Sequence, residues 1–210
     1  MFLSMRSDRV TQADRRARSR NALLESAARG LSRYGYGNLV LEQVATDAGY
    51  TRGALYHQFK DKQDLTLAVL EWILQTWTEE VGVLVEKESE PVAALLALAR
   101  GHAVFCRRDI ARVAVALRLE FSGQDHVIGR AVEDAYELLV KRCVRLINAG
   151  RKAGAIPPGP PTRSLALAFL GAFEGAVIAL DGQAPHDELL AARAAAGVLG
   201  LDPLTATRRP

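Results

Sequence analysis

The polar run Thr51-Arg52-Gly53, followed by Tyr56-His57, is the part of the sequence with the clearest chemical capacity. An arginine can donate two hydrogen bonds to the edge of a guanine. The hydroxyls of Thr51 and Tyr56 and the ring of His57 can bind phosphate oxygens, which fixes position without specifying sequence. Gly53 keeps this face slim enough for the backbone to approach a groove. These residue types are suited to contacting duplex DNA, although a surface His57 without a task and a Tyr56 in the core are alternatives.

Two short helices must position this run. The pattern predicts one helix over residues 41–48 and a second over 51–58, joined by a tight turn in which Gly49 supplies a positive φ. Leu55 and Phe59 repeat at i and i+4, which predicts that they anchor the second helix in the core. Two helices joined by a glycine turn are typical of a helix-turn-helix.

Charge is concentrated at the same end of the chain. Residues 1–60 hold ten Lys and Arg against five Asp and Glu, a net charge of +5, whereas the remainder carries −2. Such asymmetry is expected of a polyanion-binding module beside a neutral body, although a solvated basic face looks similar. Arg20, in the basic segment after an expected flexible arm at 1–13, and Lys62, at the start of a later helix, are further candidate DNA contacts.

A long ordered set of residues over about 18–66 resembles the TetR family of bacterial repressors. It comprises Ser19-Arg20, Gly35-Tyr36, Val44-Ala45, Ala48-Gly49, Thr51-Arg52-Gly53, Leu55-Tyr56, Phe59, Lys62 and Leu65. The resemblance implies a homodimer that reads palindromic operator DNA and a C-terminal domain that binds a small-molecule inducer. It also implies that five residues touch DNA, namely Thr51, Arg52, Tyr56, His57 and Lys62.

Two positions depart from the family pattern. Val40 stands where a Thr or Ser usually caps the second helix and meets a phosphate, so that contact is in doubt, and Asn38 is a partial replacement. Gln58 stands where a His is common, and it can still form hydrogen bonds.

Helical periodicity also dominates the rest of the chain, and strand signals are nearly absent. Helices are predicted over Lys62 to about Lys87, Pro91 to about Arg107, Asp109–Phe121, Gln124–Lys152, Thr162 to about Leu180 and His186–Leu199. We therefore expect an all-α fold in which an N-terminal three-helix DNA-binding domain is fused to a C-terminal helical bundle for ligand binding and dimerisation. The expected divisions are an arm at 1–13, a DNA-binding domain at 14–61, a bundle at 62–203 and a frayed tail at 204–210.

An inducer pocket is expected within the bundle, where aromatic side chains supply apolar walls and embedded polar groups orient a ligand. The predicted lining residues are Trp72, Phe105, Arg118, Phe121, Tyr136, Phe173 and Glu174. Further candidates of the same kinds are Trp77, Phe169, His102 and Glu120. The alternative for each one taken singly is plain core packing, or a simple ion pair for Arg118.

A dimer surface is expected on the helix after the proline-rich segment 156–161. Gly171 and Gly175 have a spacing that lets two helices approach closely, and the last helix is rich in alanine. Together these helices suit a four-helix interface across a two-fold axis. An ordinary core within one chain is the alternative.

Other classes of function find little support. The sequence contains no metal-ligand pair, nucleophile elbow, phosphate-cradling loop or paired-carboxylate signature, so we expect no enzyme, no cofactor and no catalytic or metal-binding residue. We expect no membrane partner and no signal peptide, and Cys106 and Cys143 are expected as reduced core residues. A cytoplasmic protein is thus expected. A ligand-binding module that has lost DNA recognition, favoured only by Val40, is the remaining alternative.

Overall fold

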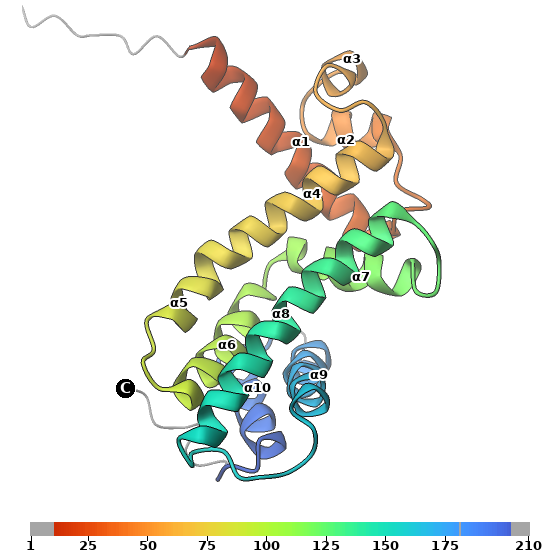
Figure 1. Cartoon of the computed structure of the whole chain (residues 1–210). Helices are drawn as coiled ribbons and strands as arrows, with labels where there is room; N and C mark the ends of the chain where they lie inside the picture. The colour runs from red at the N-terminus through yellow and green to blue at the C-terminus, as the bar shows by residue number, and fades with distance from the viewer. Residues whose placement is uncertain (1–10, 181, 203–210) are drawn as a thin grey trace, which may run out of the picture.

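The computed structural model describes residues 11–180 and 182–202, and every regular element in these ranges is helical. Figure 1 shows a head, formed by α1–α3 and the start of α4, above a larger bundle. The expected all-α class is confirmed. The α-helices are α1 (Gln12–Tyr34), α2 (Leu41–Asp47), α3 (Arg52–Tyr56), α4 (Lys62–Trp77), α5 (Val83–Glu86), α6 (Pro91–Phe105), α7 (Arg112–Glu120), α8 (Val127–Lys152), α9 (Thr162–Leu180) and α10 (His186–Val198).

The head is a three-helix unit closed by α4. The apolar stripe of α1 is fully buried at Leu23, Ala27 and Leu31, as its i, i+4, i+8 spacing requires. Leu55 of α3 and Phe59 just beyond it are also buried, and they hold α3 against this core. Local periodicity therefore fixes which side of α3 faces outward.

The first helix begins earlier than expected. Thr11 caps α1 through a reciprocal capping box with Asp14, so Gln12 is already helical and the expected arm at 1–13 is too long by two residues. Its basic residues at 15, 16, 18 and 20 therefore project from a helix. Residues 1–10 and 203–210, which hold the rest of the arm and the expected tail, lie outside the described residues.

The single helix predicted from Lys62 to Lys87 is interrupted. A π-helical turn at Thr78–Gly82 separates α4 from α5, a feature that periodicity does not reveal. A 3₁₀ turn at Asp109–Ala111 likewise precedes α7. The helix expected from Gln124 begins instead at Val127, because the ring of His126 caps α8 by accepting from the N–H of Ile128 at 3.2 Å.

The bundle below the head consists of α4–α10. Long α8 runs beside α4 and α6, while α9 and α10 pack against each other at the end opposite α3 (Figure 1). The core of this lower end is built on Phe169 and Phe173 of α9 and on Ala191 and Ala195 of α10, all fully buried. The four alanines expected at a dimer surface, Ala191, Ala192, Ala195 and Ala196, thus fill an intrachain core, so that part of the expectation is wrong.

Helix α9 is strongly apolar. It is 19 residues long, its mean hydropathy reaches 1.6, and by length and composition alone it is the one helix among the described residues that passes as a candidate membrane span. Only 28% of the 18-residue stretch over which this hydropathy is averaged is buried. One face packs on the core, and the other leaves Leu167 and Ile178 exposed at 40% and 65%. Two apolar faces, rather than one, account for its composition.

Candidate DNA-contacting surface and ligand cavity

The outer face of α3 carries the polar residues that the sequence placed there. Thr51 caps the helix, since its hydroxyl accepts a hydrogen bond from the N–H of Ala54 at 3.2 Å. Arg52, Gly53, Tyr56 and His57 are all exposed, whereas Leu55 is fully buried behind them. The expectation that Tyr56 is no core aromatic is therefore in agreement with the structure.

Arg52 is held by neighbours within the head. Its guanidinium forms an ion pair with Glu42 of α2, and it lies over the Tyr56 ring at 5.4 Å from the centroid. Both members of the pair are more than half exposed, so this interaction is weak and open to competition. The arginine is thus aligned along α3 and remains available to a polyanion.

The two flanking cations are more engaged than the sequence suggested. Lys62 donates to the carbonyl of Gly37 at 2.9 Å and lies over the Tyr36 ring at 4.7 Å. Arg20 lies over the Phe59 ring at the same distance. Both are half-buried, and each braces the head in the absence of DNA.

The start of α2 departs from the family pattern as the sequence indicated. Val40 occupies the N-cap position, and no side chain within the described ranges caps the helix there. Asn38 does not replace the missing cap, because its amide donates to the carbonyl of Tyr34 at 3.1 Å. As a cap for α2 the expectation is wrong, since Asn38 closes the end of α1 instead.

A cavity of about 640 Å³ lies among α4, α6, α7, α8 and α9. Four of the predicted residues line it, namely Phe105, Arg118, Tyr136 and Glu174. Leu74, Trp77 and Thr78 of α4 and the π-helical turn also line it, as do His102 and Cys106 of α6. This volume falls in the range that holds small organic ligands in proteins.

Three predicted lining residues lie elsewhere. Trp72 packs on the head-side core, and Phe121 stacks on the His126 ring with centroids 4.4 Å apart. Phe173 is fully buried behind the cavity, 5.0 Å from the His102 ring. These corrections share a cause, because an aromatic residue in a helical bundle can face any of several neighbours and its sequence does not say which.

Arg142 is a lining residue that the sequence analysis missed. Its signal was available, because Ala135, Leu138, Leu139 and Arg142 follow the i, i+3, i+4, i+7 pattern of one helix face, and all four line the cavity. Arg142 donates to the carbonyl of Gly82 and to Glu86, both at 3.3 Å.

One of the residues that line the cavity is a neutral histidine. His102 accepts a hydrogen bond from the indole N–H of Trp77 at 3.2 Å, and its other nitrogen lies 3.3 Å from the sulfur of Cys106. Burial lowers the pKa of His102 to about 4 and raises the pKa of Cys106 to about 12. Both groups are thus uncharged near neutral pH, and the thiol is not activated for redox chemistry.

Arg118 and Glu174 are two charged residues of the cavity wall. The guanidinium of Arg118 stacks over the Tyr136 ring, 3.6 Å from the centroid, and its Nε donates to Glu133 at 3.1 Å. Burial raises the pKa of Glu174, and the charge of Arg118 opposes this rise. The residue that α9 contributes to the cavity is therefore a partly buried carboxyl.

Glu120, a further candidate for the cavity wall, does not line the cavity. Its carboxylate accepts hydrogen bonds from the N–H groups of Tyr36 and Gly37, at 2.6 and 2.7 Å. These bonds join the end of α7 to the turn between α1 and α2. Because Arg118 precedes Glu120 by two residues, one short helix links the cavity to the head.

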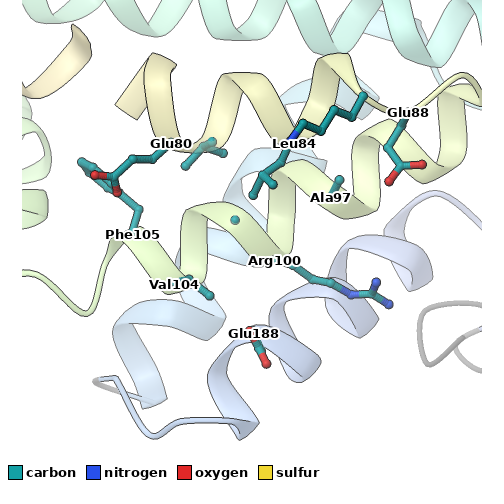
Figure 2. Close-up of a pocket in the computed structure, with 11 residues that line it drawn as sticks. Glu80, Leu84, Glu88, Ala97, Arg100, Val104, Phe105 and Glu188 are labelled. Carbon is teal, nitrogen blue, oxygen red and sulfur yellow. The ribbon is translucent and has the colours of Figure 1, made fainter. Parts of the chain in front are cut away.

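A second, smaller pocket of about 330 Å³ lies between α5, α6 and α10. Figure 2 shows Leu84, Ala97 and Val104 between the helices, with the carboxylates of Glu80 and Glu188 at the edges. These acids are already paired, Glu80 with Arg108 at 2.8 Å and Glu188 with Arg107 at 3.7 Å. These two acids thus have partners within the chain.

The geometry above defines a class, the proteins that join a helix-turn-helix head to a separate helical bundle with an internal cavity. Residues 23–69 match the family model described as bacterial regulatory proteins, tetR family. The DNA-binding domain at the N-terminal end of the chain is therefore that of the TetR family of bacterial transcriptional regulators.

Individual relatives agree with this assignment. The chain is 25% identical over 138 residues to the transcriptional regulator HbdR of Aromatoleum sp. strain CIB, covering 62% of this chain and 58% of HbdR. It is 35% identical over 60 residues to the transcriptional repressor AcnR of Corynebacterium glutamicum, covering 29% and 32%. The matches thus span less than two thirds of these relatives. Both relatives are transcriptional regulators and not enzymes, as the sequence led us to expect.

The fold is similar to that of solved regulators. AibR, solved in complex with isovaleryl coenzyme A and operator DNA, superposes with a TM-score of 0.69 at 22% identity, covering 88% of this chain and 98% of AibR. At this identity the likeness establishes the fold alone.

Proposed function

We propose that the protein is a ligand-responsive repressor of transcription that binds palindromic operator DNA as a homodimer in the cytoplasm and is released by a small-molecule inducer. The observation that carries the proposal is the exposed face of α3. Leu55 of this helix is buried, and the opposite side presents Arg52, Tyr56 and His57 outward beside the Thr51 cap. In a helix-turn-helix this face lies in the major groove.

The competition for Arg52 supports DNA as the partner. Glu42 holds the guanidinium through an exposed ion pair, which contributes about 1 kcal/mol at most. A bidentate contact to guanine contributes about 1–3 kcal/mol of discrimination, so a correct base can displace the glutamate. A wrong base would leave Arg52 on Glu42, and this sharpens specificity.

The outward face of α9 supports the homodimer. Along it lie Leu167, Gly171, Gly175 and Ile178, all exposed in the single chain. A Cβ placed on either glycine meets no described atom within 4 Å, so a second helix has room to approach. Symmetry then brings two α9 helices together, which fits a regulator that reads two half-sites.

The connection through α7 and α4 supports ligand response. Leu74 and Trp77 of α4 line the cavity, and the same helix begins under the head at Lys62. The Glu120 bonds provide a second path. A ligand that prefers a tilted α4 or α7 would move the two heads away from the spacing of about 34–36 Å that adjacent half-sites require. Identical head separation with and without ligand would contradict this mechanism.

Gel shifts test the proposal. The full chain is titrated against the DNA upstream of its gene and against a scrambled duplex, at several salt concentrations. We expect Arg52→Ala to cost about 1–3 kcal/mol and to relax specificity, while the slope with salt stays similar. Arg33→Ala is the matched control, because Arg33 is exposed at the end of α1 that lies next to α7. Equal binding to every duplex, or none, would contradict the proposal, and no binding would favour a module that has lost DNA recognition.

A further inference from the structure

Glu174 differs from the other charged residues that line the 640 Å³ cavity. Arg118 is bound to Glu133, and Arg142 is bound to Glu86 and to the Gly82 carbonyl. For Glu174 the described part of the chain provides neither a hydrogen bond nor an ion pair, only the more distant field of Arg118. The cavity thus has one carboxyl whose bonding capacity is unused.

An unused carboxyl in this position is unfavourable. The group is partly buried in a cavity whose walls are mainly apolar, and burial raises its pKa. Partial loss of hydration with no partner in the chain costs free energy, more so for a charged group. A ligand atom that donates a hydrogen bond to this carboxyl would remove the cost, so the site favours a ligand with a donor.

The remaining lining residues favour a cation over an anion. Trp77, Phe105 and Tyr136 line the space with aromatic rings, whose faces attract positive charge, as the Arg118 guanidinium over Tyr136 illustrates. An anion would need a cation, and each lining arginine would first have to leave its glutamate, Glu133 or Glu86. His102 is neutral as well. Among the described wall residues, an anion thus competes with a glutamate for either arginine, whereas a cation meets in Glu174 a carboxyl with no pair to break.

We infer that the cavity binds a lipophilic amine, whose apolar body lies among Trp77, Phe105 and Tyr136 and whose N–H⁺ donates to the carboxylate of Glu174. This inference names the inducer class and rests on the proposed function, in which this cavity is the inducer site. Since α9 supplies both Glu174 and the exposed face for a second chain, such a ligand would act on the helix between cavity and partner.

Three fluorescent probes with one body and different heads test the inference. They are 4-(pyren-1-yl)butylamine, 4-(pyren-1-yl)butanol and 4-(pyren-1-yl)butyrate, titrated against the full chain by fluorescence anisotropy. We expect the amine to bind about tenfold more tightly than the other two, as one charge-assisted hydrogen bond provides. Tightest binding of the butyrate, equal binding of all three, or no binding would overturn the inference.

Variants locate the effect. Glu174→Gln should remove the advantage of the amine, and Glu174→Lys should transfer it to the butyrate. Glu71→Gln, an exposed glutamate of α4 outside the cavity, should keep the wild-type ranking. An unchanged preference in Glu174→Gln would overturn the inference. The ranking on the wild-type protein remains decisive if a variant fails to fold.

Gel shifts with the same probes separate this inference from the proposed function. Selective binding of the amine by a protein that binds no operator would contradict the proposed function and leave the amine site standing. Release of DNA by the butyrate but not by the amine would contradict the amine site and leave the ligand-responsive regulator standing.

Discussion

The head and the cavity are built in opposite ways from the same chain. The surface that we propose contacts DNA comes mainly from one contiguous stretch, residues 51–62, whose orientation is fixed by Leu55 and Phe59 a turn apart. The cavity takes its walls from five helices, from Leu70 on α4 to Glu174 on α9. Local rules thus govern the first site and tertiary packing the second, so mutations should affect them differently.

The largest effect is expected behind the cavity. Phe173 is fully buried against Phe169 and the His102 ring, so Phe173→Ala should lower the free energy of unfolding by about 3–5 kcal/mol. Urea denaturation measures this loss. Val83→Ala, at a side chain 41% exposed, is the control and should cost less than about 1 kcal/mol. A small loss at Phe173 would contradict the view that the cavity depends on tertiary packing.

Acid should weaken the bundle through His102. Its pKa falls from 6.5 to about 4 on folding, so the unfolded chain takes up the proton first as the pH drops. This contribution is complete above pH 6.5 and is lost progressively down to pH 4, by about 3 kcal/mol in all. In His102→Gln, the pH dependence of unfolding between these values should flatten by that amount. His186→Gln, at an exposed histidine, should leave the wild-type profile unchanged.

The junction should show an intermediate effect. Glu120→Ala removes two short hydrogen bonds to the N–H groups of Tyr36 and Gly37, which should cost about 2 kcal/mol of unfolding free energy. The same change should weaken the effect of a bound ligand on DNA affinity, measured by gel shift. Glu79→Ala, which loses only a bond from Gln75 on the surface, serves as the control. Full ligand response in Glu120→Ala would show that α4 alone couples the two regions.

The smallest effect belongs to the head and follows a purely local rule. Val40→Ser supplies the side-chain cap that α2 lacks, and this should raise the free energy of unfolding by about 1 kcal/mol. Chemical denaturation measures it, with Val40→Ala as the control that adds no oxygen. If the stabilised variant also binds DNA more tightly, a hydroxyl at this position adds a phosphate contact that valine cannot make.

The sequence predicted most of the head because its information is local. The cap at Thr51, the turn at Gly49 and the anchors at Leu55 and Phe59 each depend on neighbours within a few residues. It predicted the cavity only in part. Periodicity shows that Phe121 and Phe173 are apolar positions on helices, yet only packing decides that they face the head junction and the deep core.

The sequence also did not predict where the helical backbone is irregular. The π-helical turn at Thr78–Gly82 breaks a segment whose sequence fits one continuous helix. The alanines of α10 show the converse problem, since small residues suit a contact between chains and a core within one chain equally well. Three-dimensional neighbours are needed to choose between them.

The contact at Gly35 limits how such a protein can be recombined. Its backbone has φ +73°, a conformation that favours glycine, and a Cβ there would lie 2.8 Å from the Glu120 carboxylate, which would have to shift away from its two N–H donors. A chimera that exchanges the DNA-binding head at residue 61 would keep Glu120 but import a foreign turn. Such hybrids should transmit a ligand signal only when the donor turn has a glycine here, so grafted specificity and inherited response are separable by one residue.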